Sequence, residues 1–208
     1  MNEEFKSILE KVRGLYLKYG IKSITMDDVS RELGISKKTL YQYVCDKTEL
    51  VAKVLDLDEH KVDCEFVNKE GTEKNAIIEM IDIYRNVNKM IKESNPSTIY
   101  DLKKYYPELY HHYVDVRRKR MYQSILANIK KGKQQGLYRS DLDESFISKL
   151  IVITAEKIND ANNDNFEELT SPKFFREFFI YHIRGISNAK GIKMLEENIK
   201  DFEITSNE

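Results

Sequence analysis

Residues 25–47 constrain the fold most strongly, because they contain two short apolar repeats separated by a glycine. Thr25 is followed three residues later by Asp28, which is the spacing of a capping box that begins a helix. Gly34 provides the left-handed conformation that commonly ends a helix, and Ser36 is suited to cap the next one. The stretch therefore predicts two short helices joined by a tight turn.

Each of these two helices is predicted to have one apolar side. Apolar residues recur at helical spacing at Met26, Val29, Leu33, Leu40 and Val44. The second helix, expected over residues 36–44, carries hydrogen-bond donors on its other side. These donors are Lys37, Lys38, Thr39, Gln42 and Tyr43. A short helix after a glycine turn, with a buried apolar side and a donor-rich exposed side, suits the major groove of DNA.

A longer pattern extends beyond these two helices. It comprises Leu33-Gly-Ile-Ser-Lys-Lys-Thr-Leu-Tyr-Gln-Tyr-Val44 and Asp46-Lys-Thr-Glu-Leu50. This pattern resembles the DNA-binding domain of the tetracycline-repressor-like (TetR) family, and it covers roughly the first quarter of the chain. Ser30 stands where the family usually has alanine, and Val44 where phenylalanine is common. Lys38 replaces a frequent glycine or proline, which is expected to change the bases that are read.

Two kinds of DNA contact are expected from this segment. Hydroxyl groups, and an ammonium at a helix start, suit phosphate oxygens. The residues assigned to phosphates are Thr25, Tyr41, Tyr43 and Lys47. Lysine suits guanine edges and glutamine suits adenine, so the helix front is assigned to bases. Its residues are Ser36, Lys37, Lys38, Thr39 and Gln42. The resemblance supports these roles position by position; the alternative is a helical hairpin without a DNA role.

Composition indicates the compartment in which such a protein acts. The chain has 208 residues, of which 41% are hydrophobic and 33% are charged, and its mean hydropathy is -0.57. It has no apolar run long enough for a transmembrane helix and no apolar signal segment at its start, which predicts a cytoplasmic protein without a membrane partner. The net charge of -1 indicates that DNA binding depends on a local basic surface.

No catalytic or metal chemistry is expected. Cys45 and Cys64 lack the spacing of metal ligands, and the adjacent His111 and His112 point about 100° apart on a helix. A glycine-rich phosphate loop, a paired-histidine motif and a nucleophile elbow are all absent from the sequence. We therefore predict a protein that is not an enzyme and that has no catalytic residues, metal or cofactor.

The predicted fold is all-α. We expect an amino-terminal three-helix helix-turn-helix domain over residues 1–50, with a fourth helix at about 47–64 as connector. A larger helical effector-binding and dimerisation domain is expected over residues 65–208. Further helices are predicted at 3–19, 73–94, 97–105 and 107–135, after Asp143, after Ser171-Pro172 and after Gly191, with a loop at 159–165.

The helix after Ser171-Pro172 is apolar on more than one face, which favours a partner surface. The TetR resemblance implies that the last helices pair with a second subunit in a four-helix bundle, so a homodimer is expected. The candidate interface residues are Phe146, Leu150, Phe175, Phe178, Phe179, His182 and Ile186. The alternative is that this helix is buried within its own chain.

Aromatic residues are dense between residues 100 and 113. The resemblance places an effector pocket in this helical region, where tyrosine and histidine can orient a small molecule. The candidate pocket residues are Tyr84, Tyr100, Tyr110, His111, Tyr113 and Phe146. The alternative is that these side chains cover helix surfaces.

Together these expectations describe a transcriptional regulator, most simply a repressor. It would bind double-stranded palindromic operator DNA as a homodimer and be released by a small-molecule effector that the sequence does not identify. A shift of the fourth helix would change the separation of the two reading helices. Two alternatives stay open: a DNA-binding regulator without a small ligand, and an all-α lipid or ligand carrier that retains the hairpin.

Overall fold

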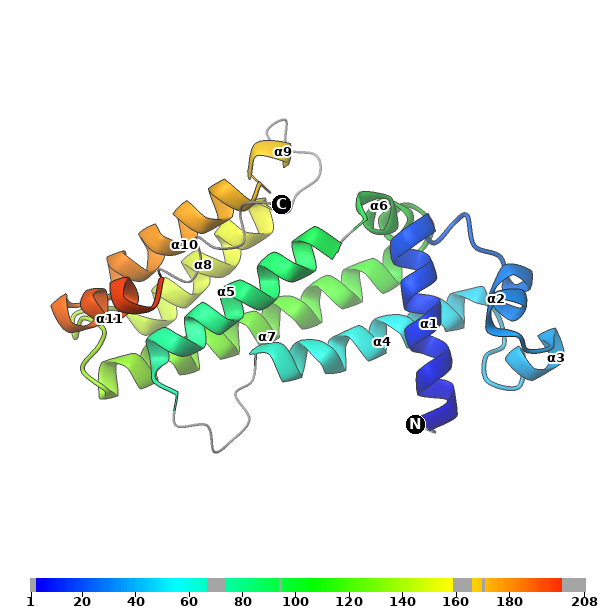
Figure 1. Cartoon of the computed structure of the whole chain (residues 1–208), viewed down its shortest axis with the longest axis horizontal. Helices are drawn as coiled ribbons and strands as arrows, with labels where there is room; N and C mark the ends of the chain where they lie inside the picture. The colour runs from blue at the N-terminus through cyan, green and yellow to red at the C-terminus, as the bar shows by residue number, and fades with distance from the viewer. Residues whose placement is uncertain (1–2, 67–73, 94, 159–165, 170, 200–208) are drawn as a thin grey trace. The chain divides into compact units, whose positions relative to one another are not determined.

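The computed structural model describes residues 3–66, 74–93, 95–158, 166–169 and 171–199. These residues form eleven helices and, outside them, one isolated bridge between Tyr138 and Ser187 (Figure 1). The predicted all-α fold is thus confirmed. The chain divides into two compact units, which we call the amino-terminal unit (residues 1–64 and 93–117) and the carboxy-terminal unit (residues 65–92 and 118–208).

The amino-terminal unit is built around the predicted hairpin. Its helices are α1 (Glu3–Tyr19), α2 (Met26–Leu33), α3 (Lys37–Leu40), α4 (Lys47–Phe66), α6 (Pro96–Tyr105) and the first part of α7 (Pro107–Gln134). Helix α1 buries one apolar side, with Leu9 and Val12 fully enclosed. Leu40 from α3 and Leu50 from α4 are equally buried in the same core. This packing fixes α3 with its polar side outward.

Helix α6 packs with the amino-terminal helices, although the predicted domain division placed it with the residues after 65. The Thr98 hydroxyl donates to the carbonyl of Tyr16 at 2.7 Å. The Lys22 amide donates to the buried carboxylate of Asp101, also at 2.7 Å. Leu102 completes the contact by entering the core of this unit. Because these partners lie about 80 residues apart in sequence, sequence periodicity does not predict them.

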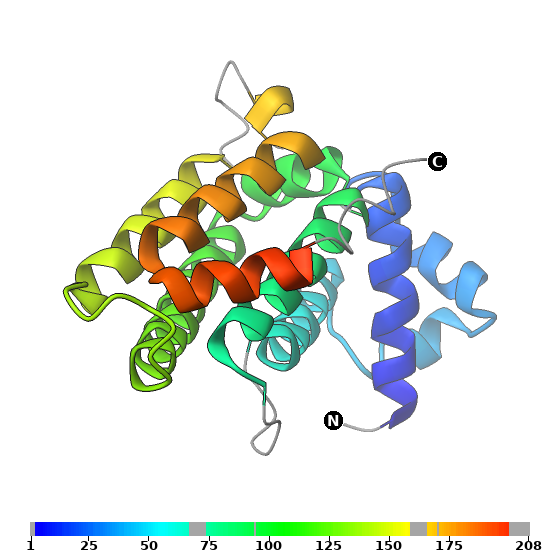
Figure 2. The same ribbon diagram turned by 60° about the vertical axis from the view of Figure 1, so that its left-hand side comes forward.

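The carboxy-terminal unit contains the other helices. They are α5 (Ala76–Glu93), the remainder of α7, α8 (Glu144–Ile158), α9 (Phe166–Leu169), α10 (Pro172–Ile186) and α11 (Ala189–Ile199). Its core joins α5 to α10, where Tyr84 stacks on Phe175 with ring centroids 5.1 Å apart and approaches Phe179 at 4.7 Å. Helices α8 and α10 run side by side in both views (Figures 1 and 2).

A buried polar network ties the start of α5 to α7. Glu79 is only 3% exposed and forms an ion pair with Lys131. The Asn128 amide donates to Glu79 at 3.1 Å and to the carbonyl of Ala76 at 2.9 Å. The Tyr138 hydroxyl donates to Asn128 at 2.9 Å, and burial raises the pKa of this phenol. The carboxylate is thus fully engaged, as a buried charge must be.

Several helix boundaries differ from the predicted ones for local reasons. Helix α5 was predicted from residue 73, but it begins at Ala76, where Asn75 caps it by accepting the amide of Ile78 at 3.0 Å. The predicted loop at 159–165 lies outside the described residues. Helix α11 begins before Gly191, since Asn188 accepts two amides at its start. Helix α9 was not predicted, because it is only four residues long.

His182 on α10 is partly exposed, but its Nε2 atom is buried without a hydrogen-bond partner, and this burial lowers the pKa of the imidazole to about 4 from 6.5. The unfolded chain takes up this proton at the higher pKa, so the folded state loses stability as pH falls from about 6.5 towards 4. The loss attributable to this group is about 3 kcal/mol at pH 4. Native protein and a His182→Gln variant should therefore converge in free energy of unfolding as pH falls, which urea titrations from pH 7 to pH 4 measure.

The exposed His112 on α7 provides the control, because His112→Gln should leave this pH dependence unchanged. An unaltered pH dependence in the His182→Gln variant would show that His182 titrates as it does in the unfolded chain.

Candidate nucleic-acid interface

The turn between α2 and α3 forms through the predicted local hydrogen bonds. Thr25 and Asp28 make the capping box: the Asp28 amide donates to the Thr25 hydroxyl at 3.1 Å, and the Thr25 amide donates to the Asp28 carboxylate at 2.9 Å. Hydrogen bonds from the Thr25 hydroxyl and the Thr25 amide to the carboxylate hold the pKa of Asp28 below its usual value. Gly34 ends α2 at a φ of 66°, and the next amide, of Ile35, donates to Ser30 at 3.0 Å.

The segment assigned to the DNA groove is less regular than predicted. Ser36 caps it by accepting the Thr39 amide at 3.0 Å, but the α-helix covers only Lys37–Leu40 rather than residues 36–44. Beyond Leu40 the chain tightens, since the amides of Gln42 and Tyr43 each bond three residues back. This turn accompanies the packing of the Tyr43 ring on Phe5, with centroids 4.8 Å apart and planes 3° from parallel.

The side chains assigned to base edges differ in their freedom. Lys38 and Gln42 are exposed. The Thr39 hydroxyl lies 2.8 Å from that of Ser36, so these two groups bond each other. Lys37 forms an ion pair with Asp27 on α2. Of the side chains assigned to bases, Lys37, Lys38 and Gln42 are thus the ones that the turn presents outward, and their base contacts stay predictions.

The side chains assigned to phosphates mostly have partners within the chain. Thr25 donates its hydroxyl to Asp28 at 2.6 Å. Lys47 donates to the carbonyl of Lys22 at 3.4 Å, and partial burial lowers the pKa of its ammonium. A hydrogen bond to Glu4 raises the pKa of the Tyr43 phenol. Tyr41 is 48% exposed. The phosphate roles of these four residues stay predictions.

Tyr43 combines a packing contact with a hydroxyl, and two substitutions separate them. Tyr43→Phe keeps the ring on Phe5 and should leave thermal stability near the native value. If the hydroxyl holds a phosphate in each of two subunits, DNA affinity should fall by about 30-fold, from about 1 kcal/mol for each hydrogen bond. Tyr43→Ala should in addition lower the free energy of unfolding by about 1–3 kcal/mol. Gel shifts and thermal unfolding measure the two effects, and native affinity in Tyr43→Phe would remove the phosphate role.

The predicted pocket residues are distributed over both units. Tyr84 and Phe146 belong to the carboxy-terminal unit, where Tyr84 is a core residue and Phe146 is 62% exposed. The amino-terminal unit contains the other four, which are Tyr100, Tyr110, His111 and Tyr113. A surface depression of about 340 Å³ lies between α1 and α2 in that unit, and none of the six lines it.

The predicted interface residues differ in exposure, and Phe178 and His182 are of intermediate burial. Phe179 and Ile186 are buried in the core of their own unit, and Phe175 stacks on Tyr84, so these three act within the chain. Phe146 and Leu150 on α8 are 62% and 50% exposed. Sequence analysis missed two further exposed residues, Ile153 and Tyr181, at 57% and 79%. The spacing of Ile153, three residues after Leu150, is the pattern that would have identified it.

Two searches of the described residues give negative findings. No helix among them is long and apolar enough to cross a membrane. Within the same part of the chain, no group of three or more histidine, cysteine, aspartate or glutamate residues is arranged to hold a metal ion.

Comparison with known proteins now places the fold. Residues 8–54 match the family model described as bacterial regulatory proteins, tetR family. No curated protein sequence matches the chain significantly. The matched residues include α2, α3 and the turn between them.

Solved structures resemble the chain over nearly its whole length. A transcriptional regulator from Cytophaga hutchinsonii has a TM-score of 0.72 at 13% identity, covering 90% of this chain and 100% of that one. A TetR-family regulator from Marinobacter aquaeolei gives 0.67 at 16% identity, with coverage of 94% and 97%. The ketosteroid transcriptional regulator KstR2 of Mycobacterium tuberculosis gives 0.54 at 14% identity, with coverage of 90% and 97%.

The fold is that of a helix-turn-helix transcriptional regulator. More narrowly, the resemblance to the TetR family is confirmed, because residues 8–54 match its model and the whole chain has the fold of TetR-family regulators.

Proposed function

We propose that the chain is a repressor that binds a palindromic operator as a homodimer and releases it when a small-molecule effector binds. The observation that carries this proposal is the surface of the α2–α3 hairpin, where Lys37, Lys38 and Gln42 are exposed above the buried Leu40. Lysine and glutamine side chains at such a position suit the guanine and adenine edges of the major groove.

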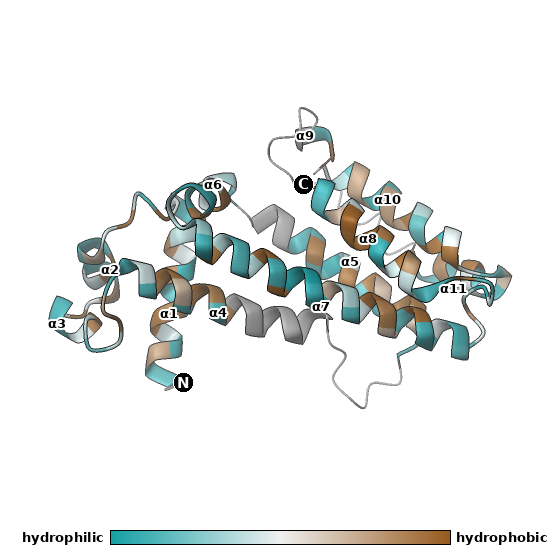
Figure 3. Cartoon of the chain, turned by 180° about the vertical axis from the view of Figure 1, so that it is seen from behind, coloured by the Kyte–Doolittle hydropathy of each residue, from teal (hydrophilic) through white to brown (hydrophobic). Residues whose placement is uncertain are grey.

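An apolar surface on the carboxy-terminal unit supports the homodimer. Phe146, Leu150 and Ile153 form a stripe along α8, and each is at least half exposed. Phe174, Phe178 and Tyr181 follow the same spacing on the adjacent α10, with the first two partly buried. Hydrophobic colour lies on both helices in Figure 3. A second copy related by a two-fold axis would cover both stripes and form a four-helix bundle.

Helices that belong to both units support the proposal that effector binding in one unit can move the other. Helix α7 begins in the amino-terminal unit and ends in the carboxy-terminal unit. Helix α6 lies directly before α7 in the chain. It bonds to α1 through Thr98 and, through Asp101, to the loop that follows α1. An effector that shifts α7 would therefore displace α6 and the hairpin together, in addition to the expected shift of α4. It favours release only by its differential affinity for the two states.

Selection of bound fragments from a random DNA pool tests the proposal. Enrichment of a palindrome with half-sites about 34–36 Å apart is the expected result. A metabolite panel is then screened for compounds that release the selected DNA. Enriched DNA without any releasing compound would favour the regulator without a small ligand, and failure to enrich any sequence would favour the ligand carrier.

A further inference from the structure

We propose that Asp27 is an internal counter-ion for Lys37. Its carboxylate pairs with the Lys37 ammonium until the DNA offers that ammonium a stronger hydrogen-bond acceptor. The inference rests on the proposed DNA binding and assigns to Asp27 the control of discrimination between operator and other DNA. Asp27 itself belongs to α2 and not to the segment expected to enter the groove.

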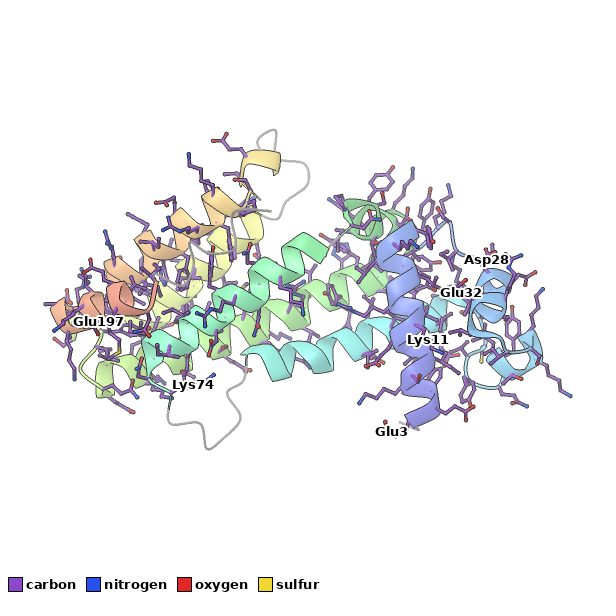
Figure 4. All side chains as sticks on the ribbon, viewed as in Figure 1. Glu3, Lys11, Asp28, Glu32, Lys74 and Glu197 are labelled. Carbon is purple, nitrogen blue, oxygen red and sulfur yellow. The ribbon has the colours of Figure 1, made fainter. Side chains whose placement is uncertain are left out.

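The ion pair joins the two helices of the hairpin. The Lys37 ammonium contacts the Asp27 carboxylate, and the two side chains are 56% and 60% exposed. Asp27 lies in the first turn of α2, where the helix dipole favours a negative charge. The next residue, Asp28, is visible at the same helix start in Figure 4, but it bonds Thr25 and Arg31 instead. Asp27 is therefore the carboxylate that serves Lys37.

The pair changes the ion balance of DNA binding. A free lysine that enters the groove brings a positive charge close to the phosphates, including when it bonds a base edge. It thereby releases a counterion from the DNA, which makes binding dependent on salt. Lys37 must first leave Asp27, and the exposed carboxylate then attracts a cation from solution. One cation is released and one is taken up, so the net contribution of Lys37 to the salt dependence is close to zero.

The same exchange favours operator over other DNA. An exposed ion pair contributes little net free energy, so a lysine contact to guanine O6 and N7 outcompetes it. On unrelated DNA, a single screened contact from Lys37 to a phosphate gains too little free energy to displace the Asp27–Lys37 ion pair. Asp27 therefore lowers the affinity for unrelated DNA more than the affinity for the operator.

The test compares native protein with Asp27→Asn on the selected operator and on unrelated DNA of equal length, at several salt concentrations. The slope of log affinity against log salt should steepen by about 2 for a dimer, from about 0.9 for each freed lysine. Affinity for unrelated DNA should rise more than that for the operator. Asp27→Ser, which keeps a polar group near the helix start, should behave in the same way.

Asp56→Asn is the matched control. Asp56 lies on α4, its side chain is 56% exposed, and it pairs with Lys53 at 4.0 Å. The substitution makes the same change in net charge outside the hairpin, so the slope should stay at the native value.

Lys37→Ala distinguishes the pairing of Asp27 with Lys37 from simple repulsion between the Asp27 carboxylate and the DNA phosphates. In the native background it should leave the slope nearly unchanged, whereas in the Asp27→Asn background it should remove the added slope of about 2. An unchanged slope in Asp27→Asn, or equal steepening with and without Lys37, would overturn the inference while DNA binding stands. Native protein that binds no DNA would instead remove the proposed function, and this inference with it.

Discussion

Replacement of both Leu150 and Ile153 by aspartate is expected to yield a monomer. These exposed residues are the second and third of the α8 stripe, and carboxylates there would have to be buried without partners in a four-helix bundle. A monomer binds one half-site at a time, so operator affinity should fall by about 100- to 10,000-fold as the second, intramolecular contact is lost. Sedimentation equilibrium and gel shifts on the selected operator measure the two losses.

Ile99→Asp provides the control for this variant. Ile99 is 40% exposed on α6 and lies in the amino-terminal unit, outside the α8–α10 surface. This substitution also adds an acidic group at an exposed apolar position, yet the protein should remain dimeric. A native dimer in the Leu150→Asp, Ile153→Asp protein would show that the subunits pair through another face.

Lys38→Ala should produce the second large effect, a loss of operator affinity of roughly 30-fold or more. A lysine that donates to guanine contributes about 1–3 kcal/mol of discrimination, and a dimer uses two such lysines. Helicity should not change, because Lys38 is exposed and the cap of α3 is made by Ser36 and Thr39. Gel shifts with operators substituted at each position should show relaxed preference at one base pair in each half-site.

Lys53→Ala on α4 is the matched change for Lys38→Ala. It also removes one lysine, whose side chain is 42% exposed and pairs with Asp56 at 4.0 Å, and its effect on operator affinity should be small. If Lys38→Ala binds the operator as tightly as the native protein, then Lys38 does not read a base.

The hairpin was predictable from sequence because its determinants are local. The capping box of Thr25 and Asp28 involves residues three apart, and the αL residue Gly34 lies directly at the end of α2. The irregular end of the reading segment was not predictable. It depends on the stacking of Tyr43 on Phe5. Phe5 belongs to another helix, and sequence periodicity does not predict such a contact.

The two apolar faces of α10 show what helical periodicity alone does not predict. Phe175 and Phe179 belong to the inner face, whereas Phe174, Phe178 and Tyr181 form the outer one. Both sets have helical spacing, so sequence alone finds two apolar faces without showing which one the chain covers by itself. The inner face is defined by Tyr84, which is about 90 residues away. The same long-range contact explains why Tyr84 is a core residue rather than an exposed aromatic.

The start of α5 is held by α7 and the residue directly after it. Gln135, which follows the last residue of α7, accepts the amide of Ala76 at 2.9 Å, and Asn128 on α7 donates to the carbonyl of the same residue. Side chains distant in sequence thus anchor the peptide groups where α5 begins. The register of α5 is consequently insulated from the segment that precedes it, and insertions or deletions ahead of Asn75 can accumulate during evolution without rotating the helix in its core.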